Sequence, residues 1–277
     1  MSNSALAQAP PSTAASGLDH LSWSGIQMYK QCQKKYFFKY IEKVPVEFVP
    51  ASLAFGAAFH RAAEFLQQRQ IEGAALPQLD ELLAQYHAGW KEITTEAAEI
   101  AFPKNDDAGT LSELASRMLS CYRDHVEQTA GAQPSRIIAI EHAHRFRLLA
   151  DVPPIEMRLD LLELSGPDLI VTDIKTSRSR WNELKIQESL PQLVLYAYGL
   201  LDMVRELGAK RIVPRFLVVT KGKKPVVQII EPKATQEDAV KLRQQVSEAW
   251  SAIKAGVFIQ RESWQCAQCP YKKRCLG

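Results

Sequence analysis

The feature that most constrains the fold is a pair of apolar segments joined by a short turn. Residues 154–164 (PIEMRLDLLEL) and 168–176 (DLIVTDIKT) are rich in aliphatic and β-branched side chains, and they flank the run Ser165-Gly166-Pro167-Asp168. Gly and Pro between two such segments are typical of a turn. The segments are therefore predicted to form a β-hairpin, preceded by a further strand within 135–149.

The register of this hairpin brings two acidic side chains together. If the turn is centred between Gly166 and Pro167, Asp160 lies opposite Asp173, with Cβ atoms about 4.5–5.5 Å apart. Lys175 shares the face of Asp173, because strand side chains alternate with a period of two. Facing carboxylates repel each other, and a divalent cation that prefers oxygen ligands, Mg²⁺ or Mn²⁺, would compensate. The alternative is a shifted register or an exposed aspartate, with no metal at this place.

The rest of the chain predicts helices on both sides of the hairpin and a second pair of strands. Helices are expected within 22–44, 52–70, 79–93, 109–128, 188–207 and 235–255, and strands at 211–220 and 225–232. The helix at 188–207 carries Pro191, which is expected in its first turn. This order indicates an α/β or α+β fold, in which flanking helices and an N-terminal helical elaboration surround a mixed sheet.

The two ends of the chain differ in character. Residues 1–18 carry no charged side chain and no continuous apolar core, so they are predicted to be a disordered tail before one domain at 19–277. No run is long enough to span a bilayer. Without an export signal, the thiols are expected in a reducing cytoplasm, where clustered cysteines bind metal more often than they form disulfides.

The net charge of +3 is unevenly distributed. Residues 1–100 carry a net charge of −2, residues 101–203 carry −4, and residues 204–277 carry +9. A basic C-terminal quarter suits a polyanion such as DNA, although solubilising surface charge is an equally simple explanation. Arg178, Arg180 and Trp181 follow the hairpin as a basic-aromatic run, which suits phosphate and base contacts or merely caps a loop.

Three of the five cysteines lie within the last twelve residues. Cys266, Cys269 and Cys275 form a tight loop of soft ligands, which leaves one position open in a four-ligand site. Such loops bind Zn²⁺ or an iron–sulfur cluster. We expect Cys121 to have a structural role.

Several motifs, in order along the chain, resemble one family. The hairpin LDLLELSGPDLIVTDIKT resembles the core motif of the PD-(D/E)XK nuclease superfamily, in its RecB-like branch. FGAAFHRAAE resembles the Gly-x-x-x-His motif of that branch, with His60, and QLVLYAYGL resembles its Gln-x-x-x-Tyr motif, with Gln192 and Tyr196. SWSGIQMYKQCQKKYFFKY is similar to the first helix of the iron–sulfur members, with Cys32 in the corresponding place.

The resemblance implies a restriction-endonuclease-like core and a metal-dependent site for phosphodiester hydrolysis. The implied metal ligands, for one or two ions of Mg²⁺ or Mn²⁺, are His60, Asp160, Asp173 and the backbone carbonyl of Ile174. Lys175 would orient the attacking water or offset phosphate charge. The implied catalytic set is Asp160, Asp173, Lys175, Gln192 and Tyr196, and Glu141 is expected to support the site rather than bind metal.

The resemblance also completes the cysteine site. In AddB and in CRISPR-associated RecB-like exonucleases one cysteine precedes the nuclease core and three follow it, as Cys32 and Cys266, Cys269 and Cys275 do here. The implied group is a 4Fe–4S cluster, with structural Zn²⁺ as the alternative. The cluster would fasten residues 264–277 to the first helix as a clasp.

The implied function is a DNA exonuclease acting on single strands or frayed ends in recombination or repair. A helicase or a recombination or adaptation protein is the expected partner, because the chain holds no helicase motif. Alternatives are a nuclease of CRISPR adaptation or phage DNA processing, and a non-catalytic iron–sulfur protein that binds DNA ends. A redox or regulatory protein with incidental hairpin carboxylates is a further alternative.

Overall fold

The computed structural model describes residues 17–96, 99–130 and 135–277. It forms two compact units: unit 1 comprises residues 1–46, 145–156 and 240–277, and unit 2 comprises 47–144 and 157–239. Most of the predicted tail, residues 1–16, lies outside the described residues. Within the described ranges, no helix combines the length and apolar character that crossing a membrane requires.

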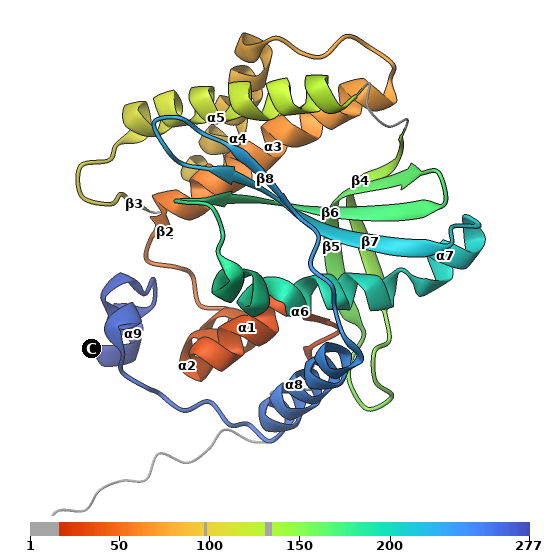
Figure 1. Ribbon diagram of the computed structural model, residues 1–277. Helices are drawn as coiled ribbons and strands as arrows, with labels where there is room; N and C mark the ends of the chain where they lie inside the picture. Colours follow the sequence, from red (N-terminus) through yellow and green to blue (C-terminus); the bar gives the residue numbers. More distant parts are fainter. Residues whose placement is uncertain (1–16, 97–98, 131–134) are drawn as a thin grey trace, which may run out of the picture. The chain divides into compact units, whose positions relative to one another are not determined.

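Unit 2 is built on a mixed β-sheet, which confirms the predicted fold class (Figure 1). β5 (Ile155–Ser165) pairs with β6 (Asp168–Ser177) antiparallel, β6 pairs with β7 (Arg211–Thr220) parallel, and β7 pairs with β8 (Val227–Ile230) antiparallel. β4 (Arg136–Phe146) adds to β5. The parallel pair β6 and β7 needs a crossover, which α6 (Glu183–Gly199) and α7 (Leu201–Glu206) supply.

The hairpin has the register that its turn predicts. Paired residues run from Leu161 with Thr172 to Ser165 with Asp168, and Gly166 takes the positive φ of 55° that the tight turn requires. Asp160 and Asp173 lie one step beyond the Leu161–Thr172 pair, at the end of the ladder away from the turn. Both are buried, with exposed fractions of 9% and 1%.

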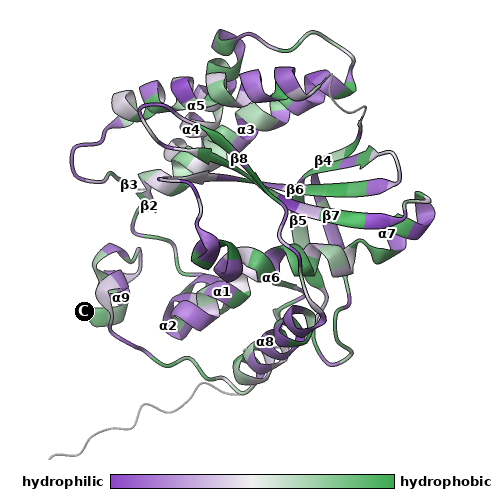
Figure 2. Ribbon diagram, in the orientation of Figure 1, coloured by the Kyte–Doolittle hydropathy of each residue, from purple (hydrophilic) through white to green (hydrophobic). Residues whose placement is uncertain are grey.

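Helices cover both faces of this sheet. α3 (Ala51–Ile71), α4 (Leu79–Glu96) and α5 (Ala108–Thr129) lie on one face and α6 on the other (Figure 1). The core between α3–α5 and the sheet includes Phe55, Phe59, Tyr86, Met118, Ile174 and Leu217. Figure 2 shows hydrophilic and hydrophobic residues alternating around α5, as expected for a helix with one solvent-facing side. The short strands β2 (Val49–Pro50) and β3 (Ile100–Ala101) pair beside them.

Unit 1 joins the first helices to the last segment of the chain. It contains β1 (Leu21–Ser22), α1 (Trp23–Gln31), α2 (Gln33–Tyr36), the π-helical turn η2 (Phe37–Ile41), most of α8 (Gln236–Lys254), the 3₁₀ turn η3 (Trp264–Gln268) and α9 (Lys272–Leu276). The Tyr29 hydroxyl donates to the carbonyl of Val257 at 2.6 Å, and the amide of Ile259 donates to the side chain of Gln33 at 3.0 Å. The ring of Phe258 lies 4.9 Å from that of Phe37. Residues more than 200 positions apart therefore share one small aromatic core.

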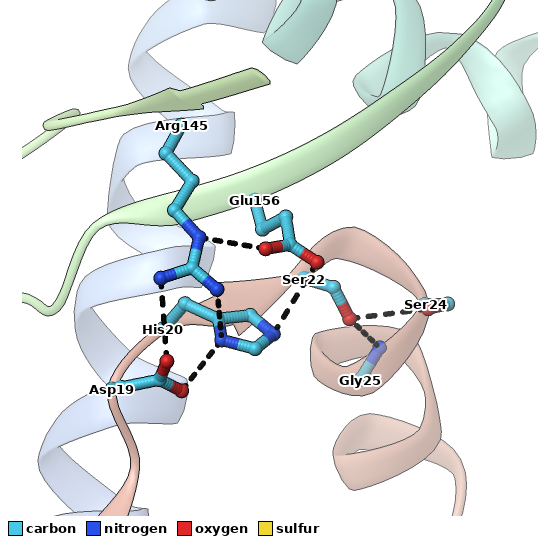
Figure 3. Close-up of polar contacts among 7 residues, drawn as sticks. All are labelled: Asp19, His20, Ser22, Ser24, Gly25, Arg145 and Glu156. Atoms are coloured by element: carbon cyan, nitrogen blue, oxygen red, sulfur yellow. Dashed lines mark hydrogen bonds and ion pairs between the residues drawn. The ribbon is translucent and has the colours of Figure 1, made fainter. Parts of the chain in front are cut away.

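A polar network holds the edge of unit 1 where β1 pairs with the start of β5 (Figure 3). Arg145 donates to Glu156 at 2.6 Å and to Asp19 at 3.2 Å, and His20 lies between these groups. These side chains are largely exposed, so each pair contributes little to the free energy of unfolding.

Two predicted helices differ from the structure. The helix expected within 22–44 breaks at Cys32, whose φ and ψ of −156° and 104° are extended, so that Cys32 ends α1 and precedes α2. The helix expected at 188–207 begins earlier, at Glu183, where Asn182 caps it. Pro191 therefore lies inside α6 and not in its first turn.

Candidate active site

The hairpin, β4 and α3 bring three possible metal-binding side chains together in unit 2. Ligand atoms of His60 on α3, Glu141 on β4 and Asp160 on β5 all lie within 4.8 Å of one another. Nδ1 of His60 lies 3.6 Å from Oδ1 of Asp160 and 3.7 Å from Oε1 of Glu141. One imidazole nitrogen and two carboxylate oxygens form a donor set that suits Mn²⁺ or Mg²⁺.

Glu141 adopts a backbone conformation that is unusual for its residue type. Its φ is +44°, in the left-handed region, in the middle of strand β4. For a residue other than glycine this conformation is strained, and such strain is concentrated at functional sites. The sequence predicted only a supporting role for Glu141, whereas the structure places its carboxylate among the candidate donors.

Asp160 is fixed by the backbone of the neighbouring strand. Its Oδ2 accepts a hydrogen bond from the amide of Ile174 at 2.6 Å, which leaves Oδ1 directed toward His60. The same pairing holds Ile174, whose side chain is buried in the core. Among the described residues, no contact links the Ile174 carbonyl to His60, Glu141 or Asp160. Its role as a metal ligand therefore stays a prediction.

Asp173 lies outside the three-residue group and is surrounded by donors from α6 and β6. Its Oδ1 accepts from Gln192 Nε2 at 2.8 Å and lies 3.0 Å from the Tyr196 hydroxyl. Gln192 also donates to the Tyr196 oxygen at 2.8 Å. Gln192 and Tyr196 are one helical turn apart on α6, so both reach the same carboxylate. The structure thus brings together the predicted set of Asp173, Lys175, Gln192 and Tyr196.

The second oxygen of Asp173 has free acceptor capacity. Lys175 Nζ lies 2.7 Å from Oδ2 as an ion pair, and among the described residues no other group hydrogen-bonds to this buried oxygen. A buried carboxylate oxygen in this state carries a desolvation cost that a cation relieves. A divalent cation therefore fits the chemistry of this cluster of side chains.

The electrostatics of the cluster indicate excess negative charge. Burial, and then the charge of Asp173, raise the pKa of Asp160 to about 7. Burial lowers the pKa of His60, but its hydrogen bond to Glu141 and the charge of Asp160 outweigh this effect and raise it above the usual value. For Lys175, the charges of Asp173 and Asp160 likewise outweigh burial, and its pKa is raised. Protonated groups thus balance the carboxylates, a task that a metal ion also performs.

The four predicted cluster cysteines lie together in unit 1. One small hollow is lined by all four, Cys32, Cys266, Cys269 and Cys275, and its wall includes Phe38 and Tyr271. All are free thiols. Burial, followed by the charges of Cys32 and Cys269, raises the pKa of Cys275.

Backbone amides point at two of the sulfurs. Cys32 Sγ accepts from the amide of Lys35 and Cys266 Sγ from the amide of Ser263, each at 3.4 Å. Amide hydrogen bonds of this kind favour thiolate ligands. Cys121 lies in unit 2 and donates to the carbonyl of Pro225 at 3.3 Å, and burial raises its pKa.

Comparisons with known proteins concern the family and the fold of the chain. The family model of the PD-(D/E)XK nuclease superfamily matches residues 20–276. A solved structure named "Putative exonuclease", from Eubacterium rectale, is 12% identical, with a TM-score of 0.56 over 94% of this chain and 90% of that one. The structure of SSO0001 is 12% identical over 90% of this chain and 96% of that one, with a TM-score of 0.34, too low to define a shared fold. The search of curated proteins finds no match.

Proposed function

The chain belongs to the PD-(D/E)XK nuclease superfamily, and we propose that it is a DNA exonuclease that uses Mg²⁺ or Mn²⁺ and acts on single-stranded or frayed ends. The observation that carries the proposal is the convergence of His60, Glu141 and Asp160 beside the ion pair of the buried Asp173 with Lys175. The family is one of nucleases with a restriction-endonuclease-like core, and the mixed sheet of unit 2 agrees with it. The similar solved structure is named as an exonuclease, which favours that mode of cleavage.

The chain's own residues divide the work of hydrolysis. The metal would be held by His60, Glu141, Asp160 and Asp173. When bound, it supplies an acidified water and neutralises charge on the phosphate. Lys175 is held by Asp173 and presents an ammonium group to the same place, where it can orient the attacking water or offset phosphate charge. Gln192 and Tyr196 fix the orientation of Asp173 through hydrogen bonds to Oδ1.

The assay offers end-labelled linear single strands, linear duplexes and circular single strands with Mg²⁺ or Mn²⁺. An exonuclease releases short products from linear strands and leaves circles intact. Asp173→Asn should lower the cleavage rate by at least about 100-fold. Asp202→Asn, a matched change at an exposed carboxylate that pairs with Arg205, should leave the rate unchanged. Cut circles would refute the exonuclease mode. DNA binding without cleavage under either metal would indicate the non-catalytic alternative.

We further propose that Cys32, Cys266, Cys269 and Cys275 hold a 4Fe–4S cluster. In a four-cysteine Zn²⁺ site, with Zn–S bonds of about 2.3 Å, the sulfurs lie about 3.8 Å apart. Here no three of the four sulfurs lie within 4.8 Å of one another, although all line one hollow. This spacing favours a group larger than a single ion. A reducing cytoplasm, the proposed location, would keep these thiols available as ligands.

Elemental analysis of anaerobically purified protein tests this proposal. We expect about four irons per chain and broad absorbance at about 400 nm. The Cys32→Ser variant should lose both the iron and the absorbance. The fifth cysteine provides the control, because Cys121→Ser should retain the full iron content. Stoichiometric zinc without iron would refute the cluster. Because the chain carries no helicase motif, an unwinding partner is part of the proposal for duplex substrates.

A further inference from the structure

Two basic residues, Arg178 and Lys221, directly follow the adjacent strands β6 and β7 of unit 2. The last pair of the parallel strands β6 and β7 is Ser177 with Thr220. The amide of the next residue, Lys221, still donates to the carbonyl of Ser177 at 2.6 Å. The backbones of Arg178 and Lys221 are therefore neighbours at the carboxyl ends of two adjacent strands. Arg178 follows Lys175 by three residues, which is about 10 Å along the strand.

Neither side chain has a carboxylate within ion-pair distance in the described part of the chain. Lys221 Nζ lies 4.4 Å from the centre of the Phe55 ring, so its stem packs on the core and its head is fixed. Burial, and then the charge of Arg178, lower the pKa of Lys221, while Asp106 acts weakly in the opposite direction. Like charges held together in this way are stabilised when an anion lies between them.

The basic character continues along both segments. Two residues further on, Arg180 and Lys223 line a hollow of about 790 Å³, and Arg117 of α5 contributes a third cation. Asp124 is its one acidic lining residue. Burial, and then the charge of Arg215, lower the pKa of His125 in the wall, which favours its neutral form.

This local charge is opposite to that of the surrounding unit. Unit 2 as a whole has 20 Lys and Arg against 25 Asp and Glu, a net charge of −5, whereas the residues lining this hollow carry +2. None of the candidate metal-binding residues lines the hollow. Such a concentration of cations suits a polyanion.

We propose that the substrate strand runs from the metal site over the ends of β6 and β7 into this hollow, with its phosphates bound by Arg178 and Lys221 and then by Arg180, Lys223 and Arg117. The inference rests on the proposed function and adds the path of the strand. Leu79, Val226 and Val227 give the hollow an apolar lining on which bases can lie, and its volume suits a few nucleotides of a single strand. At about 3.4 Å per stacked nucleotide, Arg178 lies about three nucleotides from the scissile phosphate.

Trp181 does not take part in this path. Its amide donates to Oε1 of Gln228 at 2.8 Å, and its carbonyl accepts from Nε2 of Gln228 at 3.1 Å. The centre of its ring lies 4.9 Å from that of the buried Phe216. It caps the sheet, and base contacts by Trp181 are not part of the inference.

The test measures the affinity of chelator-treated protein for fluorescent oligothymidylates of three, six and twelve nucleotides at several salt concentrations. Wild type should bind the twelve-mer more tightly than the three-mer. Arg178→Gln and Lys221→Gln should each remove part of this gain and reduce the slope of log affinity against log salt by about 0.7. Arg178 is exposed and its variant should fold normally; a thermal melt of each variant verifies this.

Lys210→Gln is the matched control, because Lys210 is exposed and precedes the opposite end of β7. Its affinity and salt slope should equal those of wild type. If Arg178→Gln and Lys221→Gln bind every oligonucleotide as wild type does, the path is wrong even though the enzyme cleaves DNA. Equal or tighter binding of a blunt duplex would overturn the single-strand assignment. Wild-type protein that neither binds nor cleaves DNA would instead refute the proposed function itself.

Discussion

At the scale of single residues, the site is a balance of buried charges. Asp160 and Asp173 are both buried, and Lys175 and His60 supply the nearest positive charge. In the absence of metal, ionising Asp160 is unfavourable, and this is why its pKa rises to about 7. A metal ion would reverse that cost, because it favours the ionised form of its ligands.

The first prediction concerns the stability of metal-free protein. The folded-state pKa of Asp160, about 7, lies above its usual value of 3.8. Below pH 4 this carboxyl is protonated in both the folded and the unfolded protein, so it does not destabilise the fold. As the pH rises toward and through 7, the unfolded protein loses this proton more readily than the folded protein, and the free energy of unfolding falls. Asp160→Asn keeps an acceptor for the Ile174 amide and removes the titration. With a chelator present, the variant should gain stability over wild type between pH 4.5 and pH 7.5, by up to about 3 kcal/mol.

Thermal melts at the two pH values measure this difference. Added Mg²⁺ should raise the melting temperature of wild type at pH 7.5 more than that of Asp160→Asn. Parallel pH profiles for the two proteins would contradict the assignment.

The second prediction concerns Glu141. If its carboxylate binds metal, Glu141→Gln should weaken Mn²⁺ binding by about 10- to 100-fold, as measured by titration calorimetry. Glu127→Gln, a change on the exposed side of α5, provides the control. Unchanged affinity in Glu141→Gln would return Glu141 to the supporting role that the sequence predicts.

At the scale of elements, the alternation of strands and the turn residues made the hairpin predictable. The composition of Ser165–Asp168 located the turn, and the period of two then determined that Asp160 faces Asp173. What the sequence could not reveal was the backbone conformation of single residues. The positive φ of Glu141 and the extended conformation of Cys32 depend on tertiary packing, which overrides local helix and strand propensity. Pro191 was placed in a first turn because the start of α6, capped by Asn182, was expected five residues too late.

The third prediction concerns α6, which presents Gln192 and Tyr196 to Asp173. Tyr196→Phe removes the hydroxyl that lies 3.0 Å from both Asp173 Oδ1 and the carbonyl of Arg158. We expect kcat to fall while KM stays nearly constant, together with a loss of about 1 kcal/mol in stability. Tyr198→Phe, two residues along the same helix, should change neither. A rise in KM alone would indicate that Tyr196 contacts DNA rather than Asp173.

At the scale of the whole molecule, the first and last parts of the chain form one unit. The sequence predicted the shared cysteine site only through a family resemblance, since spacing along the chain cannot show that residues 32 and 275 meet. The structure adds contacts that do not depend on any cluster, such as those of Tyr29 with Val257 and Gln33 with Ile259. The prediction of a single domain at 19–277 stays a prediction.

The fourth prediction tests the clasp. Cys32 and Cys275 lie at opposite ends of the chain but line the same hollow. If they hold one group, Cys32→Ala and Cys275→Ala should lower the melting temperature of anaerobic protein by similar amounts, and combining them should add little further loss. Cys121→Ala is the matched control for metal content. Metal content that depends only on the three C-terminal cysteines would refute the clasp.

The central claim is that the buried carboxylates of unit 2 form a metal-dependent nuclease site. The most direct measurement is the initial rate at which an end-labelled single-stranded oligonucleotide is cleaved as Mg²⁺ or Mn²⁺ is titrated into metal-free protein. The account predicts no cleavage without metal, saturable cleavage with it, and a rate at least about 100-fold lower for Asp160→Asn but unchanged for Asp202→Asn. Absence of cleavage by wild type with either metal, or cleavage that persists in Asp160→Asn, would contradict it.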